Sequence, residues 1–359
     1  MKKLSRFLSS CATPALLFLL LAVSCVTPFQ PEVATMPRAL VVDGQITDQP
    51  GPHYVRLTRT ADYTNAALNL VEIGATLVIT DNLNNRQPLT ETADKGTYAT
   101  PAGFRGVAGR TYTLSIQTAD GKRYESAPEL LRAPVPIKKL YYEYRQNPLS
   151  IAVNDVHGWD VYADLDDPKE TDNYYRWSWV HYNQIYACRT VSPPGQDNVF
   201  LDYPCCTNCW EIVRCNGCIN INSDALINGN TLSRQSIVRV PYTSSSRYYL
   251  EVEQQHLSKG AFEFLNSAKK LTQSTGGLFD PAPAALRGNV RSLASPEELV
   301  FGYFGAAGVT VMPLYVDRRD IRVSPPAQRQ VDFGQPSRAC VVCENNSFRT
   351  PNRPRWWEF

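Results

Sequence analysis

The chain has 359 residues, a formal net charge of +2, 43% hydrophobic residues and 11% aromatic residues. This apolar content excludes wholesale disorder and, at this length, predicts one large domain or two. The nearly neutral charge lacks the basic field that nucleic-acid binding requires, so no nucleic-acid partner is expected.

The first 24 residues have the features of a secretory signal peptide. The chain opens MKKLSRF, and the apolar run 15–23 is too short to span a bilayer, which needs about 20 apolar residues. Ser24 and Cys25 follow directly, and this order resembles a bacterial lipobox. We therefore predict a lipoprotein signal peptide over residues 1–24 and lipidation of Cys25. The alternative is an ordinary secretory signal with an incidental cysteine.

A tether and a first β domain are expected next. Residues 25–38 are proline-rich and unpatterned, which is typical of a tether. In residues 39–133, short alternating runs are separated by turn signals such as Asp120-Gly121. Their spacing of about 8–12 residues favours an immunoglobulin-like β-sandwich. The expected strands are 39–46, 53–60, 75–81, 96–100, 111–118 and 122–126.

A second, larger β-rich domain is expected over residues 137–359, after the predicted boundary Ala133-Pro134-Val135-Pro136. One helix is expected near residues 258–275, because Ser258 is a favourable N-cap and Gly276-Gly277 ends the apolar period. The predicted fold class is therefore mainly β. The expected strands are 137–145, 160–164, 174–180, 218–223, 236–240, 247–255, 299–304, 309–316 and 320–323.

Eight cysteines remain when Cys11 of the signal and Cys25 are set aside. An even number outside the cytoplasm favours structural disulfides, here with a disulfide-rich insert at residues 188–218. Two alternatives stay open, a metal site and a catalytic dithiol. Zinc ribbons separate their CxxC pairs by about 15–20 residues, more than this chain does, and a redox CxxC is expected at a helix start. The candidates are Cys188, Cys205, Cys206, Cys209, Cys215, Cys218, Cys340 and Cys343.

The segment DLDDPKETDN, residues 164–173, is the candidate metal site. Its carboxylates would suit Ca²⁺, which takes about six to eight oxygen ligands, although the EF-hand order with its central glycine is missing. A solvated turn between strands is the simpler interpretation, and no other cofactor is predicted. The acidic residues are Asp164, Asp166, Asp167, Glu170 and Asp172.

The aromatic residues of the middle of the chain are the candidate ligand-binding residues. Tyr175, Trp177 and Trp179 alternate with other residues and so share one face of a strand. An exposed row of this kind could stack on sugar rings or hold a peptide, whereas a buried row would fill the sandwich core. Trp210, between Cys209 and Glu211, is a second candidate, either as a partner anchor or as packing beneath a loop.

Recognisable catalytic motifs are missing. The sequence contains no GxSxG, no HExxH, no phosphate-binding loop and no dinucleotide fingerprint. The four histidines, His53, His157, His181 and His256, are scattered along the chain. We therefore predict that the protein is not an enzyme.

Several stretches resemble the domain of unknown function 4249 family of outer-membrane lipoproteins. They are LVVDGQIT, YYRWSW, Cys209-Trp210, the long stretch from YYLEVEQQHLSKGAF to ALRGNV, FGYFGAAGV and the terminal Cys340/Cys343 pair. The resemblance covers nearly the whole chain after the signal. It implies a lipoprotein produced beside a TonB-dependent outer-membrane receptor, with no established activity.

Two functions are therefore weighed. The first is a lipid-anchored binding or accessory protein of the outer membrane that works with a TonB-dependent receptor, on either the periplasmic or the cell-surface face. The second is an extracytoplasmic hydrolase that uses paired carboxylates from residues 160–172, which would have to face each other across a cleft. The first is preferred.

Overall fold

The structure, a computed structural model, describes residues 38–61, 70–147, 149, 156–170, 172–196, 198–225, 228–273, 286–334 and 337–358. Residues 39–60 and the described residues from Leu70 onward belong to one compact unit. The mainly β prediction is confirmed, since the described ranges contain nineteen strands and one helix. The predicted signal peptide, Cys25 and residues 26–37 of the tether lie outside the described residues.

The N-terminal half folds into short antiparallel strands. Alternation explains them, because a strand such as TYTLSIQ buries Tyr112, Leu114 and Ile116 on one face and turns the residues between them away. The strands are β1 (Leu40–Thr47), β2 (Tyr54–Arg59), β3 (Leu70–Val71), β4 (Thr76–Asp81), β5 (Arg86–Glu91), β6 (Thr97–Ala99), β7 (Thr111–Gln117), β8 (Arg123–Ser126) and β9 (Glu129–Leu130). Their buried faces form a core of mostly aliphatic residues and tyrosines. The immunoglobulin-like topology stays a prediction.

The second half adds longer strands and a separate three-stranded sheet. In that sheet β11 lies between β10 and β15, and its apolar face packs on the large sheet through Trp159, Tyr175, Trp177 and Leu250. The strands are β10 (Lys139–Gln146), β11 (His157–Asp166), β12 (Tyr174–Val191), β13 (Leu201–Arg214), β14 (Asn220–Ser223), β15 (Thr231–Pro241), β16 (Tyr248–Leu257), β17 (Val290–Ser292), β18 (Val300–Val316) and β19 (Arg349–Thr350).

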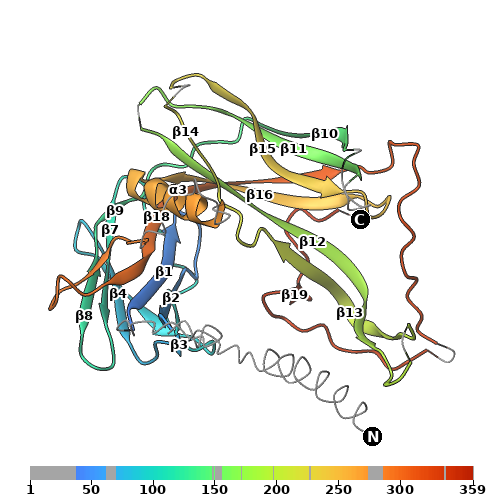
Figure 1. The fold of residues 1–359 in the computed structure, drawn as a ribbon, viewed down its shortest axis with the longest axis horizontal. Helices are drawn as coiled ribbons and strands as arrows, with labels where there is room; N and C mark the ends of the chain where they lie inside the picture. The colour runs from blue at the N-terminus through green and yellow to red at the C-terminus, as the bar shows by residue number, and fades with distance from the viewer. Residues whose placement is uncertain are drawn as a thin grey trace, which may run out of the picture. The chain divides into compact units, whose positions relative to one another are not determined.

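Strand β18 belongs to both parts of the large sheet (Figure 1). Its first half runs parallel to β1, from Val300 opposite Leu40 to Ala307 opposite Thr47. Its second half runs antiparallel to β16 as far as Val316. In addition, β17 pairs with β8. Residues 290–307 therefore contribute strands and buried side chains to the core of the N-terminal half, and the predicted division at residues 133–137 stays a prediction.

Two glycines allow β18 to make this crossing. Gly302 has a φ of +83°, and a Cβ there would clash with the Val42 carbonyl of β1. A Cβ on Gly308 would clash with the backbone of Arg132 and Pro134. Only glycine accepts the left-handed conformation at Gly302 and the close backbone approach at both positions.

The helix, α3 (Lys259–Gln273), begins where the sequence predicts. The Ala261 amide donates a hydrogen bond to the Ser258 hydroxyl oxygen at 3.1 Å, which makes Ser258 the N-cap. Ala261, Phe262 and Leu265 pack against the large sheet at Leu257 and its neighbours. The predicted helix end at Gly276-Gly277 lies outside the described residues. No helix in the described ranges is long and apolar enough to cross a membrane.

The structure departs from the strand predictions mainly in the longer strands, and it adds the short strands β3, β9, β17 and β19. The two predicted strands 299–304 and 309–316 are one strand, β18, because Gly305 to Gly308 continue the pairing across their small side chains. β12 extends eleven residues beyond the predicted end at Val180, to Val191. β5 and β13 were not predicted, since neither has an alternating apolar pattern. Residues 320–323 form no strand.

Candidate functional site

The outer half of the β12–β13 hairpin extends beyond the strands that pack on the cores. β12 pairs with β16 from Tyr174 to Tyr182, and after Tyr182 the described strand that continues beside it is β13. Figure 1 shows these two long strands with β19 next to β13. We call the described residues of 183–214 together with those of 329–350 the disulfide-bonded extension.

A large β-bulge interrupts this hairpin. Ile185 pairs with Cys209 and Ala187 pairs with Pro204, so that residues 205–208 of β13 lie opposite Tyr186 alone. The Cys188–Cys205 disulfide crosses the two strands at the bulge, with Cα atoms 4.8 Å apart. Bulges re-aim side chains and are frequent next to functional sites. Here the bulge directs two successive cysteines to different partners.

The C-terminal segment is cross-linked to β13 along this bulge. Cys206 is bonded to Cys340 and Cys209 to Cys343, with Cα–Cα distances of 4.9 and 5.6 Å. Between the two bridges, the Val341 amide donates to the Pro204 carbonyl at 2.8 Å. Further along, β19 pairs with Trp210 and Glu211. The segment therefore covers an edge of β13 that would otherwise present unpaired backbone groups.

The remaining cysteines close a short turn. Cys215 and Cys218 are bonded to each other, three residues apart. The structure thus pairs all eight predicted cysteines in four disulfides, within residues 188–218 and between that region and the C-terminal CxxC. In this oxidised state the sulfurs are bonded to one another rather than held as thiolates for a metal or for redox catalysis.

A buried ion pair attaches the chain that leads to the C-terminal segment. The Asp202 carboxylate is fully buried and accepts two hydrogen bonds from the Arg329 guanidinium, at 2.6 and 2.8 Å. Thr190 and the Asp332 amide donate to the same carboxylate at 2.7 and 2.9 Å. Arg329, with these further donors, holds the pKa of Asp202 well below its usual range. The carboxylate is therefore charged at every physiological pH.

Trp210 is buried beneath the C-terminal residues rather than presented to a partner. Its ring makes an edge-to-face contact with Trp357, with centroids 6.1 Å apart. Trp357 in turn packs edge-to-face on Tyr249 at 5.3 Å. The partner-anchor interpretation of Trp210 is not supported by this placement, because its side chain is 2% exposed. Trp210 therefore has the packing role that was the alternative in the sequence analysis.

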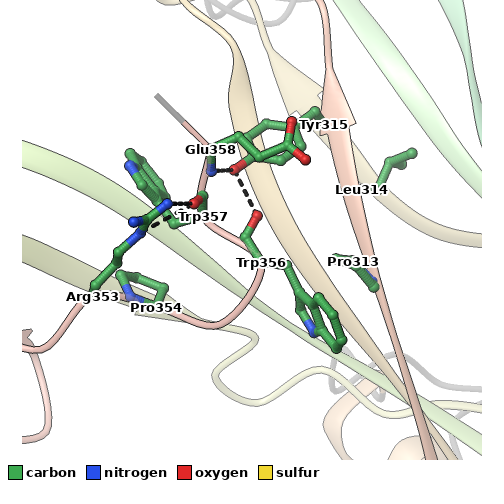
Figure 2. A pocket seen from close by; sticks show the side chains of 8 residues that line it. All are labelled: Pro313, Leu314, Tyr315, Arg353, Pro354, Trp356, Trp357 and Glu358. Carbon is green, nitrogen blue, oxygen red and sulfur yellow. Dashed lines mark hydrogen bonds between the residues drawn. The ribbon is translucent and has the colours of Figure 1, made fainter.

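An open pocket of about 460 Å³ lies between the end of β18 and the last residues of the chain (Figure 2). The Tyr315 hydroxyl donates to the Trp356 carbonyl at 3.0 Å, and the Arg353 guanidinium donates to the Trp357 carbonyl at 3.2 Å. These bonds order the wall of the pocket. The lining residues are Pro313, Leu314, Tyr315, Arg353, Pro354, Trp356, Trp357 and Glu358.

The predicted aromatic row lies in the core. Tyr175 and Trp177 are fully buried, and Trp179 packs half-buried against the same cluster. The Trp177 indole donates to the Gln254 side chain at 3.0 Å, and the Tyr175 hydroxyl donates to Asp167 at 2.5 Å. The three rings do share one face, but the three-stranded sheet covers it. They are therefore not available to stack on a ligand.

The described carboxylates of the predicted acidic segment are engaged in separate contacts. Asp164 and Asp166 point outward from β11, and Asp166 forms an ion pair with Lys138 at 2.8 Å. Asp167 is buried and accepts hydrogen bonds from Tyr175 and the Gly229 amide. Asp172 accepts from the Tyr174 hydroxyl at 3.2 Å.

The carboxylates of this segment do not converge. Among the residues that the structure describes, the group close enough to hold a metal is a cysteine cluster rather than Asp164, Asp166, Asp167, Glu170 or Asp172.

Sequence reasoning missed the side chains that the extension exposes. Tyr186 and Phe348 are each 67% exposed and Val342 is 72% exposed, although all three are apolar or aromatic. Their sequence signal was weak, because Tyr186 lies in a β-rich run and Val342 lies between two cysteines. The spacing of Cys340 and Cys343 around Val342 was the available sign that this stretch is held rigid at the surface.

The family assignment follows from the sequence as a whole. The family model described as Domain of unknown function (DUF4249) matches residues 26–312, which include the whole β12–β13 hairpin, β18 to Met312 and most residues of both cores. No curated protein matches the chain. The match confirms the resemblance inferred from LVVDGQIT and the other stretches. Because the model covers most of the chain, the protein belongs to the DUF4249 family.

Proposed function

We propose that this protein is a lipid-anchored accessory protein of the outer membrane that binds a partner protein through the disulfide-bonded extension. The partner that the family resemblance implies is a TonB-dependent receptor. The observation that carries the proposal is the exposure of aromatic side chains on a part of the chain that is rigidly cross-linked.

Exposed aromatic residues concentrate near the C-terminal segment. The three most exposed aromatic side chains among the described residues are Tyr186 and Phe348 at 67% and Trp356 at 61%. Elsewhere in the described ranges, the largest fully buried side chains are mostly aromatic, such as Trp159, Tyr124 and Phe304. Large apolar side chains left in water are the residues that contribute most when a partner covers them, and aromatics are enriched at such hot spots.

The cross-links prepare this surface for binding. Cys188–Cys205, Cys206–Cys340 and Cys209–Cys343 join two strands and the C-terminal segment within a short length of hairpin. A surface that is already ordered loses less conformational entropy when it binds, and affinity rises accordingly.

The membrane anchor is the second part of the proposal. The signal pattern that ends at Ser24 and Cys25 supports lipidation of Cys25, and the proline-rich tether that follows would let the folded part reach a membrane partner. Cys25→Ala is expected to release the protein from the membrane fraction and to abolish labelling with a fatty-acid probe. An unlabelled wild type would remove this part of the proposal.

The binding surface is tested by co-purification from membranes of the native host. The Tyr186→Ser/Phe348→Ser double variant is expected to lose a receptor that co-elutes with the wild type. Tyr54→Ser is the matched control, because Tyr54 is an exposed tyrosine on β2 (52% exposed), outside the extension. Circular dichroism and thiol counting establish that each variant keeps its fold and disulfides. Retention of the receptor by the folded double variant would contradict the proposed surface.

A further inference from the structure

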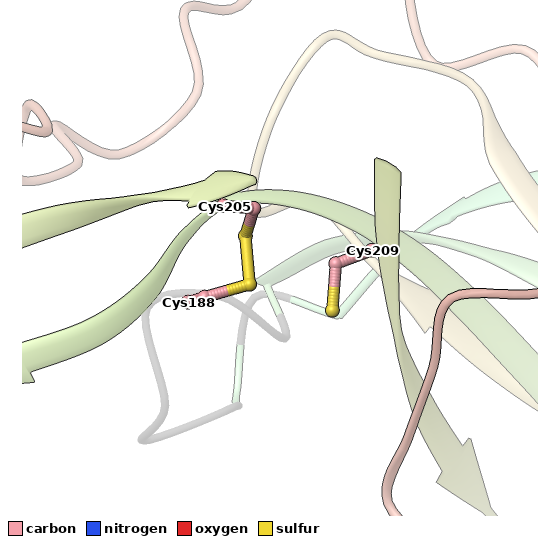
Figure 3. Close-up of side chains that lie close together, drawn as sticks. All are labelled: Cys188, Cys205 and Cys209. Atoms are coloured by element: carbon pink, nitrogen blue, oxygen red, sulfur yellow. A yellow bond between two sulfur atoms is a disulfide. The ribbon is translucent and has the colours of Figure 1, made fainter. Parts of the chain in front are cut away.

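Three sulfur atoms meet inside the extension. The Sγ atoms of Cys188, Cys205 and Cys209 all lie within 4.8 Å of one another (Figure 3). Cys188 is bonded to Cys205, and Cys209 is bonded to Cys343 of the C-terminal segment. Two separate disulfides therefore lie side by side: three of their sulfurs are within 4.8 Å of one another, and the fourth, of Cys343, is bonded to the Cys209 sulfur.

The surroundings of this group are apolar and preformed. Cys188, Cys209 and Cys343 are buried, and Ile185, Val341 and the half-buried Cys205 pack against them. The four cysteines come from three chain segments, β12, β13 and the docked C-terminal segment. The backbone pairing of those segments involves hydrogen bonds that do not depend on the sulfur–sulfur bonds, such as Val341 to Pro204.

We propose that the reduced form of this protein binds Zn²⁺ at this cluster, with the thiolates of Cys188, Cys205, Cys209 and Cys343 as the four ligands. Four sulfur ligands in tetrahedral geometry are the set that structural zinc sites use, with Zn–S distances of about 2.3 Å. Such a site places sulfurs about 3.8 Å apart, which follows from the same Zn–S distance. The sulfurs of Cys188, Cys205 and Cys209 already lie within 4.8 Å of one another, and the Cys343 sulfur is joined to that of Cys209. Rotation of these side chains brings the four sulfurs to this arrangement.

The oxidised and zinc-bound states exclude each other. A phosphine reductant transfers two electrons to each disulfide; each S–S bond breaks, water supplies two protons to the sulfurs, and the phosphine becomes a phosphine oxide. Zinc then displaces the four thiol protons as the thiolates bind. Both states join β12 and β13 to the C-terminal segment, so zinc would keep the extension assembled when the disulfides are reduced.

The chain offers a matched control for this site. Cys215 and Cys218 form a CxxC pair that lies outside the cluster and is bonded to itself. The pair has the spacing of a zinc knuckle, but neither of its cysteines belongs to the sulfur group found among the described residues. A non-specific thiol effect would involve Cys215 and Cys218 as readily as the cluster, whereas the proposed site would not.

The experiment uses the protein without the predicted signal peptide, residues 1–24. The protein is reduced with a phosphine under nitrogen, loaded with Zn²⁺ and desalted. Elemental analysis is expected to give one zinc per chain for the wild type and for Cys215→Ser/Cys218→Ser, and none for Cys188→Ser/Cys209→Ser. Cobalt substituted for zinc is expected to show the absorption of a tetrahedral four-thiolate site. This spectrum of the wild type decides the matter if the cluster variant does not fold.

Results of three kinds would overturn the proposal. The first is a reduced wild type that retains no zinc. The second is a Cys188→Ser/Cys209→Ser variant that binds zinc as the wild type does, or a control pair that abolishes binding. The third is a cobalt spectrum of octahedral type.

Discussion

The core of the N-terminal half and the disulfide-bonded extension are stabilised by different interactions. The core buries aliphatic side chains such as Leu57 and Leu114 completely, and each contributes by leaving water. The buried cluster of the extension consists of Cys188, Cys209 and Cys343. Cross-links restrict the unfolded chain instead of burying area. The comparison shows that one chain uses two sources of order, and each responds to a different perturbation.

The largest effect is expected from a cavity in the core. Leu114→Ala should lower the free energy of unfolding by about 3–5 kcal/mol, because the fully buried side chain leaves a cavity in a strand held on both sides by β4 and β8. Denaturant unfolding measures the loss. The same loss should appear with the disulfides oxidised or reduced. A loss that occurs only after reduction would show that the core depends on the extension.

Removal of the bridges to the C-terminal segment should act on the extension alone. Two disulfides, Cys206–Cys340 and Cys209–Cys343, close nearly the same loop of the chain. When one of them is removed, the other still closes that loop. Replacement of all four cysteines by alanine should therefore lower the free energy of unfolding of the extension by about 2–4 kcal/mol. Replacement of one disulfide pair should lower it by less. Hydrogen exchange is expected to rise in residues 201–214 and 340–350 and to stay unchanged in β1, β4 and β7. Faster exchange in those core strands would contradict the separation.

The strands of the core were predictable because their pattern is local. Alternation in residues 111–118 identifies β7 from seven residues, and Ser258 identifies the start of α3 from a capping preference. β13 was not predictable in the same way, because CCTNCW has no alternation and its place depends on residues 134 positions away. Pairing over that distance is decided by the docked segment, which leaves no periodic signal in either partner.

The candidate site was predictable in its chemistry and much less in its geometry. Oxidised cysteines followed from their even number and expected compartment, but the stacking of Cys188–Cys205 beside Cys209–Cys343 required the bulge at Tyr186. Likewise, periodicity correctly placed Tyr175 and Trp177 on one face. Periodicity does not say whether a face meets water or another sheet, and here it meets the three-stranded sheet.

A smaller effect on the extension is expected from its buried charge. Asp202→Asn should lower the free energy of unfolding by about 2 kcal/mol, less than a fully buried pair would lose, because Arg329 is 41% exposed. The pKa of Asp202 is lowered in the folded state, first by Arg329. Its contribution is therefore complete above the unfolded pKa of about 3.9 and is lost as the pH falls below it.

The pH dependence separates this charge from simple packing. The difference in stability between wild type and Asp202→Asn should shrink progressively below about pH 4, the unfolded pKa of aspartate. Urea unfolding at a series of pH values, followed by a label on the C-terminal segment, measures it. Thr190→Val is the matched control, since it removes one hydrogen bond to Asp202 without changing the charge. A difference that stays constant with pH would show that the carboxylate is not stabilised as an ion.

The smallest effect is expected at the boundary between the two cores, where α3 begins. Ser258→Ala should lower the free energy of unfolding by about 1 kcal/mol, because the Ala261 amide loses its acceptor. Ser258→Thr retains a hydroxyl and should cost less. Exchange of the amides in the first turn of α3 measures the loss directly, and equal exchange in the alanine and threonine variants would contradict the capping role.

The same substitution also has a pH dependence, because the Ser258 hydroxyl donates to the buried carboxylate of Glu129. Burial raises the pKa of Glu129, while hydrogen bonds from Ser258, Tyr303 and Asn289 partly oppose that rise. A raised folded pKa means that the stability provided by the protonated carboxyl is lost as the pH rises. Without the hydrogen bond from Ser258, the ionised form of Glu129 is less stable in the folded protein. The loss in free energy of unfolding caused by Ser258→Ala should therefore grow from pH 4 to pH 8, as Glu129 ionises. An equal cost at both pH values would show that Ser258 acts as a helix cap alone.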